Sequence, residues 1–90
     1  MNHPKHIEKY NGSLQELSRD IVNLDYDALV KLFTTLKEDF DLDASNDKKL
    51  NHPQVADFLR NIADDLKKTL EKNIQPMADI CRSYNEKGIK

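Results

Sequence analysis

Residues 50–55 read LNHPQV and carry the signals of a helix start. If Asn51 is the N-cap, Gln54 occupies the capping-box position and Leu50 can pack on Val55. If His52 is the N-cap instead, Pro53 takes the first helical position. A backbone N–H at this position has no acceptor within the helix, so proline, which lacks the N–H, costs no hydrogen bond there. Both alternatives predict a helix that begins near residue 53.

The chain after residue 53 carries a long apolar stripe. From Leu66 to Tyr84 the apolar residues follow one another in steps of three or four, an average of 3.6, so the stripe keeps its phase across Pro76. A proline inside a helix removes a hydrogen bond and usually kinks or ends the helix. We therefore predict a helix over about residues 53–87, kinked or broken near residue 76.

Two shorter helices are predicted upstream of the quoted stretch. Ser13 and Glu16 form a capping box that starts a helix over about residues 14–23. Asp25 can cap a second helix over about residues 26–39, and Leu24 and Leu29 then occupy the two positions of a hydrophobic staple. Residues 1–12 are expected to form an N-terminal arm.

Residues 40–52 contain several aspartates and are predicted to be an acidic connector. Asp39, Asp41 and Asp43 match the first three acidic positions of a calcium-binding EF-hand loop. The rest of the loop does not match, because Ala44 stands where glycine is needed and Leu50 stands where a bidentate glutamate is needed. A solvated connector is the favoured interpretation, with a weak cation site as its alternative.

The composition predicts one all-α domain over residues 1–90. Charged residues make up 33% of the chain and aromatic residues 7%, with two glycines, a balance that suits amphipathic helices and is poor for a β-sandwich. We expect a small antiparallel helical bundle of three to four helices. A straight helix over residues 53–87 would be about 52 Å long, so either the chain folds back at Pro76 or a second subunit covers the exposed half.

Several classes of function are disfavoured by charge and by residue usage. The net charge of −2 gives no basic face for nucleic acid, and no apolar run is long enough to span a membrane. The N-terminus lacks the apolar core of a signal peptide and the single cysteine, Cys81, cannot form an internal disulfide, so we expect a cytoplasmic protein. No set of titratable residues has the spacing of a catalytic, cofactor or metal site, and we expect neither an enzyme, a cofactor, a metal site nor a small-molecule substrate.

The leading hypothesis is a noncatalytic protein–protein interaction module that forms a homodimer through its C-terminal helix. One alternative is a small acidic inhibitor, of the immunity-protein type, that binds a basic partner. A second alternative is a weak divalent-cation-binding helical protein. The residues expected at the self-association surface are Leu66, Leu70, Ile74, Met77, Ile80 and Tyr84, and those of the acidic partner-binding patch are Glu38, Asp39, Asp41 and Asp43.

Overall fold

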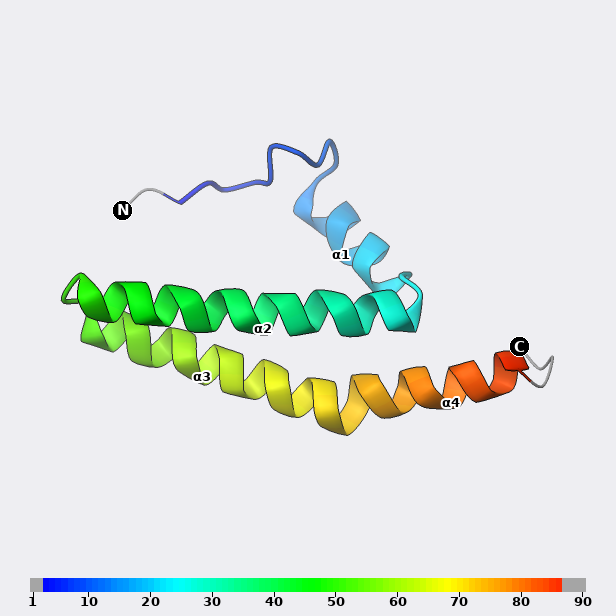
Figure 1. The fold of residues 1–90 in the computed structure, drawn as a ribbon. Coiled ribbons are helices and arrows are strands. Elements are labelled where there is room, and N and C mark those ends of the chain that lie inside the picture. Colours follow the sequence, from blue (N-terminus) through cyan, green and yellow to red (C-terminus); the bar gives the residue numbers. More distant parts are fainter. Residues whose placement is uncertain (1–2, 87–90) are drawn as a thin grey trace.

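The computed structural model describes the backbone of residues 3–86 and the side chains of residues 3–84. These residues contain helices and no strand, which confirms the predicted all-α class. The elements are α1 (Leu14–Val22), α2 (Tyr26–Lys49), α3 (Pro53–Thr69), the π-helical turn η1 (Leu70–Ile74) and α4 (Gln75–Glu86). α3, η1 and α4 follow one another without a gap, so the elements form three rods, α1, α2 and this last one; Figure 1 shows their arrangement.

The start of α1 is fixed by its own residues, as the sequence predicts. The Glu16 backbone N–H donates to the Ser13 hydroxyl oxygen at 3.1 Å, and the Ser13 backbone N–H donates to the Glu16 carboxylate at 3.1 Å. This reciprocal pair satisfies two of the N–H groups that a helix start leaves without a partner. The helix ends at Val22, one residue earlier than predicted.

Asp25 caps α2 in the predicted manner. Its carboxylate accepts from the backbone N–H groups of Asp27, at 2.7 Å, and of Ala28, at 3.2 Å. A negative charge at this place also meets the positive end of the helix dipole. The staple residue Leu29 is buried beneath this start.

The predicted end of the second helix at residue 39 and the predicted connector over residues 40–52 are wrong. α2 continues through the aspartates to Lys49, which leaves a connection of only three residues, 50–52. The stretch contains no glycine or proline, the two residue types that break helices most strongly, and Ala44 within it is fully buried. Packing therefore outweighs the weak helix propensity of Asp, Asn and Ser, and Lys48 and Lys49 stabilise the negative end of the helix dipole.

The connection is a Schellman turn with asparagine in the left-handed position. Asn51 has φ of 67° and its N–H donates to the Lys48 carbonyl oxygen at 3.2 Å. The His52 N–H donates to the Asp47 carbonyl oxygen at 2.8 Å, and His52 Nδ1 lies 3.3 Å from Asp47 Oδ1. His52 is also the N-cap of α3, with Pro53 as its first residue, so the second of the two predicted starts is the one observed.

The irregularity predicted at Pro76 lies instead over residues 70–74, just before the proline. There the Gln75 N–H donates to the Leu70 carbonyl oxygen, an i to i−5 bond that widens the helix by one residue. A proline ring in a regular helix clashes with the carbonyl four residues earlier, here that of Lys72, and the wider turn relieves this clash. The helix consequently passes Pro76 without ending; its predicted end at residue 87 lies outside the described residues.

α2 and the rod formed by α3, η1 and α4 make a helical hairpin (Figure 1). We call the end with residues 50–52 the turn end, and the end where α2 begins and α4 runs the open end. The molecule as a whole is long and thin, with overall extents of 53 × 30 × 14 Å and a radius of gyration of 16.2 Å. A compact chain of 90 residues would have a radius of gyration of about 12 Å.

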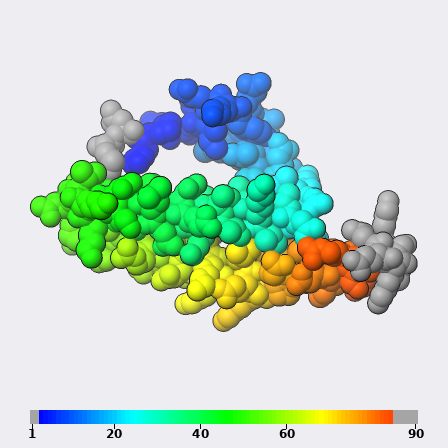
Figure 2. Space-filling model, in the orientation of Figure 1, coloured from blue at the N-terminus to red at the C-terminus, as the bar shows by residue number. Residues whose placement is uncertain are grey.

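Most of the buried core consists of small side chains. Ala44, Ala56, Ala63 and Ala78 are buried, and Leu29 and Ile74 are the two larger apolar side chains buried among the described residues. No residue of α1 is buried. Figure 2 shows open space between α2 and the segment that contains the arm and α1. The hairpin is therefore held by narrow helix-to-helix contacts, and α1 adds little to its core.

Candidate functional site

One side of the hairpin gathers apolar side chains from both helices. α2 packs against α3, and Ala44 on α2 and Ala63 on α3 are completely buried, so they mark the sides of the two helices that face inward. Each residue of an α-helix is rotated by about 100° from the one before. Leu36 then lies about 80° from Ala44 and Ile62 about 100° from Ala63, in the same rotational sense. Because the two helices run in opposite directions, the same sense places both residues on one side of the hairpin.

We call this surface the apolar side. Its members are Leu29, Leu32 and Leu36 from α2 and Val55, Phe58, Ile62 and Leu66 from α3. Several are strongly exposed: 37% for Leu36, 46% for Val55, 41% for Ile62 and 69% for Phe58. A cluster of large apolar side chains left open to water on one side of a small protein is typical of a surface that binds a partner.

The opposite side of the hairpin is polar. Lys37 pairs with Asp41 at 3.2 Å on α2, and Lys67 pairs with Glu71 at 3.9 Å at the end of α3. The same rotation places Asp41 about 60° from Ala44 and Lys67 about 40° from Ala63, both in the sense opposite to Leu36 and Ile62, while Lys37 lies within about 20° of Ala44. The hairpin as a whole is thus amphipathic, which neither helix alone reveals.

The structure separates the residues expected at the self-association surface into three groups. Ile74 belongs to the chain's own core, where it is buried, and Leu66, Leu70 and Met77 are half-buried at its edge. Ile80 and Tyr84 are exposed. The π turn divides the stripe, because its extra residue rotates α4 by about 100° and turns Ala78, in place of Met77, toward α2.

The four residues of the expected acidic patch all lie on α2 and point in different directions. Starting from Glu38, the positions of Asp39, Asp41 and Asp43 are spread over more than half of the helix circumference at about 100° per residue. Asp41 already pairs with Lys37. The helical conformation therefore separates these carboxylates. In an extended connector the alternate residues Asp39, Asp41 and Asp43 would have pointed to the same side.

Among the side chains of residues 3–84, no three of histidine, cysteine, aspartate or glutamate come together in a way that could hold a metal ion. None of the helices within residues 3–86 combines the length and the apolar composition needed to cross a membrane.

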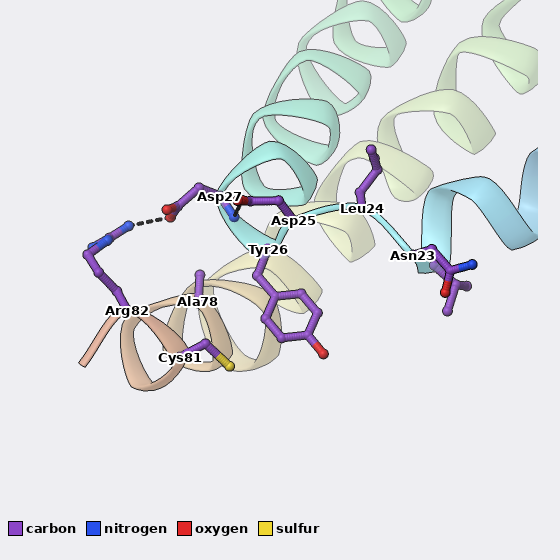
Figure 3. A pocket seen from close by; sticks show the side chains of 9 residues that line it. Asn23, Leu24, Asp25, Tyr26, Asp27, Ala78, Cys81 and Arg82 are labelled. Carbon is purple, nitrogen blue, oxygen red and sulfur yellow. Dashed lines mark hydrogen bonds and ion pairs between the residues drawn. The ribbon is translucent and has the colours of Figure 1, made fainter. Parts of the chain in front are cut away.

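A shallow pocket of about 420 Å³ lies at the open end of the hairpin. It is bounded by the corner between α1 and α2 and by one side of α4 (Figure 3). An ion pair between Arg82 and Asp27 closes one flank, while the ring of Tyr26 and the thiol of Cys81 lie on the other. Val22, Leu24 and Ala78 complete its apolar lining.

Comparisons with protein-family models, with curated proteins and with solved structures found no match for this chain.

Sequence reasoning missed the most exposed residues of the candidate surface. The spacing of Val55, Phe58 and Ile62 by three and four is typical of one helix face. These residues come before Leu66, however, and the surface was predicted only from the stripe that continues across Pro76. Their grouping with Leu36 depends on the position of the turn at residues 50–52. The sequence did not predict this turn position, because the aspartates after residue 38 indicated that the second helix ends at residue 39 and not at Lys49.

Proposed function

We propose that the protein is a noncatalytic assembly module that forms a homodimer through the apolar side of its hairpin. In this dimer α3, the first part of the long C-terminal helix, supplies the most exposed contact residues. The single observation that carries the proposal is the apolar side itself, which exposes Val55, Phe58 and Ile62 of α3 together with Leu36 of α2. Two hairpins joined on this side would complete the antiparallel helical bundle that the sequence predicts.

The accessible surface of one copy supports the proposal. The chain has a mass of 10.4 kDa and an accessible surface of 7550 Å². A compact monomer of this mass exposes about 5,400 Å², so one copy exposes roughly 2,100 Å² more than expected. A standard protein–protein interface buries about 800 Å² on each partner. The excess is spread over the N-terminal arm, α1 and both sides of the hairpin, and it leaves enough surface for an interface of this size.

The small size of the core supports it further. A buried alanine contributes much less apolar area than a buried leucine or phenylalanine, and four of the six buried apolar residues are alanines. A second copy would remove Leu36, Phe58 and Ile62 from water. Burying such side chains contributes about 1.5–3 kcal/mol each to stability when burial is complete.

The test is the solution mass by light scattering for the natural chain and two variants. We expect the natural chain to have twice the monomer mass and Phe58→Asp to have the monomer mass, because the aspartate would bury a charge at the interface. Leu42→Asp is the matched control. Leu42 is 60% exposed, similar to Phe58, but faces away from the apolar side, so this variant should remain a dimer.

Circular dichroism accompanies the mass measurement, and it will show whether the variants keep their helices. A natural chain that stays monomeric at high concentration would overturn the proposal. So would a dimer that is disrupted equally by both substitutions, because the apolar side would then have no special role.

A further inference from the structure

α1 carries an apolar stripe that has no partner helix in the structure. Leu14, Leu17 and Ile21 lie within about 60° of one another around the helix axis, so they form one stripe. Leu14 is 57% exposed, and no residue of α1 is buried. α1 has no extensive contact with any other described helix, and Figure 2 shows open space between α2 and the segment that contains the arm and α1.

A helix as short as α1 needs such a partner. It has nine residues, and isolated helices of fewer than about 12–15 residues are marginal in water. The capping box of Ser13 and Glu16 satisfies backbone groups of the first turn but buries no apolar surface. Because most of the stability of a protein helix comes from packing its apolar face, α1 requires an apolar surface within its reach.

The arm leaves the stripe of α1 available. Tyr10 donates its hydrogen bond to Asp20, which lies about 60° from Leu17 and about 120° from Leu14 around the helix axis. This bond therefore holds Tyr10 at one flank of the stripe and not over its centre.

The connector lets α1 fold back along its own hairpin. Residues 23–25 join α1 to α2, and loops of two to five residues commonly join antiparallel helices. The nine residues of α1 span about 14 Å, the same length as the nine residues of α2 from Tyr26 to Thr34. In an antiparallel arrangement Leu17 then lies level with residue 31 of α2, and Leu14 lies level with residue 34.

Partly covered leucines lie at these levels on the apolar side. We call Leu29, Leu32, Leu36 and Leu66 the open-end part of this side. Leu36 and Leu66 are each 15 residues from Asn51, so they lie level with each other on the two helices of the hairpin. Leu36 is 37% exposed, and Leu32 and Leu66 are half-buried. A third helix laid along them would complete their burial.

We propose that α1 is a lid that closes onto the open-end part of the apolar side. In the closed form Leu17 packs beside Leu32, Leu14 meets Leu36, and the three helices form a small bundle. The lid belongs to the same chain, because a short connector holds it at an effective concentration of about millimolar. A second copy at ordinary protein concentrations cannot compete with this.

The lid leaves the rest of the apolar side open to a second copy. Phe58 is seven residues after Asn51 and Ala44 is seven residues before it, so the two are level along the hairpin. The 18 residues from Tyr26 to Ala44 span about 27 Å, about twice the length of α1. Phe58 therefore lies beyond the lid. The closed form needs no second copy, so it stands or falls separately from the proposed homodimer.

Disulfide trapping tests the closed form in the full chain. Cys81→Ser first removes the one natural thiol. Leu14→Cys with Leu36→Cys then adds two thiols that meet when the lid is closed, and diamide should join them within one copy in most molecules. Leu14→Cys with Glu38→Cys is the matched control, because Glu38 is exposed and is turned about 160° from Leu36. This pair should give almost no disulfide, since Cα atoms more than about 7 Å apart cannot be bridged.

A gel without reductant and mass spectrometry separate a link within one copy from a link between two copies. Circular dichroism shows whether each variant keeps its helices. A second measurement needs no cysteine. Leu17→Ala should lower the urea midpoint of unfolding, and Gln15→Ala should not, because Gln15 lies on the opposite face of α1 and both changes alter helix propensity little.

The outcomes separate the lid from the homodimer. Disulfides in both cysteine pairs, or in neither, would overturn the lid, and so would equal urea midpoints for Leu17→Ala and Gln15→Ala. A disulfide that joins two copies would also overturn it, because α1 would then belong to the other chain. A monomer by light scattering with the disulfide formed within one copy would overturn the homodimer and support the lid.

Discussion

At the scale of single residues, Asn51 decides how the hairpin turns. Its φ of 67° is the one positive value at a non-glycine position within residues 3–86. Asparagine tolerates this conformation better than most residues, and a β-branched side chain does so worst. The turn therefore depends on the conformational preference of this one residue.

We expect Asn51→Val to lower the free energy of unfolding by about 1–2 kcal/mol and Asn51→Gly to leave it unchanged or slightly raised. The measurement is urea denaturation at one fixed protein concentration. Asn61→Val is the matched control, since Asn61 is exposed in the middle of α3 and should lose only a few tenths of a kcal/mol. Equal losses at both positions would show that the turn conformation is unimportant.

Tyr10 fastens the N-terminal arm to α1. Its hydroxyl donates to Asp20 at 2.5 Å, and this hydrogen bond raises the pKa of Tyr10 to about 12. The ring also lies so close to Gly12 that a Cβ at that position would meet it at 2.8 Å. Because the folded protein holds the phenolic proton more tightly than the unfolded chain does, this attachment is fully present below pH 10 and is lost as the pH rises through about 12.

Asp20→Asn should lower the pKa of Tyr10 toward its ordinary value of 10.0, because it removes the charged acceptor. An NMR titration of the Tyr10 ring carbons measures this directly. Glu16→Gln is the control and should cause a smaller decrease, since Glu16 is the weakest of the causes that raise this pKa. An unchanged titration in Asp20→Asn would contradict the assignment of the hydrogen bond as the main cause.

At the scale of elements, the contact between α2 and α3 depends on the smallness of its residues. Ala63 is fully buried, so a larger side chain has no space without moving one helix away from the other. We expect Ala63→Leu to destabilise the fold by about 1–3 kcal/mol, measured by urea denaturation. Asn61→Leu, two residues away and exposed, is the control and should change stability little. A stable Ala63→Leu variant would mean that the helices are not closely packed there.

The helix starts were predictable because their signals are local. Ser13 and Glu16, Asp25, and His52 with Pro53 each act within one turn of the chain. The end of α2 was not predictable in this way, because residues 40–49 are kept helical by the packing of Ala44, and the residues on which it packs come after the turn. The π turn was missed because a steady spacing of apolar residues cannot show that one turn is wider than the others.

At the scale of the whole molecule, only part of the candidate site followed from the sequence. The expectation of an apolar surface on the C-terminal helix stays a prediction, but the residues that the structure leaves most exposed on it are Phe58 and Val55, before the predicted stretch. Ile74 was expected at this surface and instead lies in the core. The exposed residues differ from the expected ones because the packing of α3 against α2 decides which side of each helix is buried. That packing can be inferred only when the position of the turn between the two helices is known.

The three-residue turn also determines the order of events during folding. It joins two helices that are neighbours in sequence, so the contacts next to the turn close short loops, whereas those at the open end, such as Asp27 with Arg82, join residues 55 apart. Helical topologies generally form within microseconds to milliseconds. A chain leaving the ribosome would reach this shape long before it meets another copy. The slow step in reaching the proposed bundle is then the encounter of two finished hairpins, and its rate rises with the concentration of the protein.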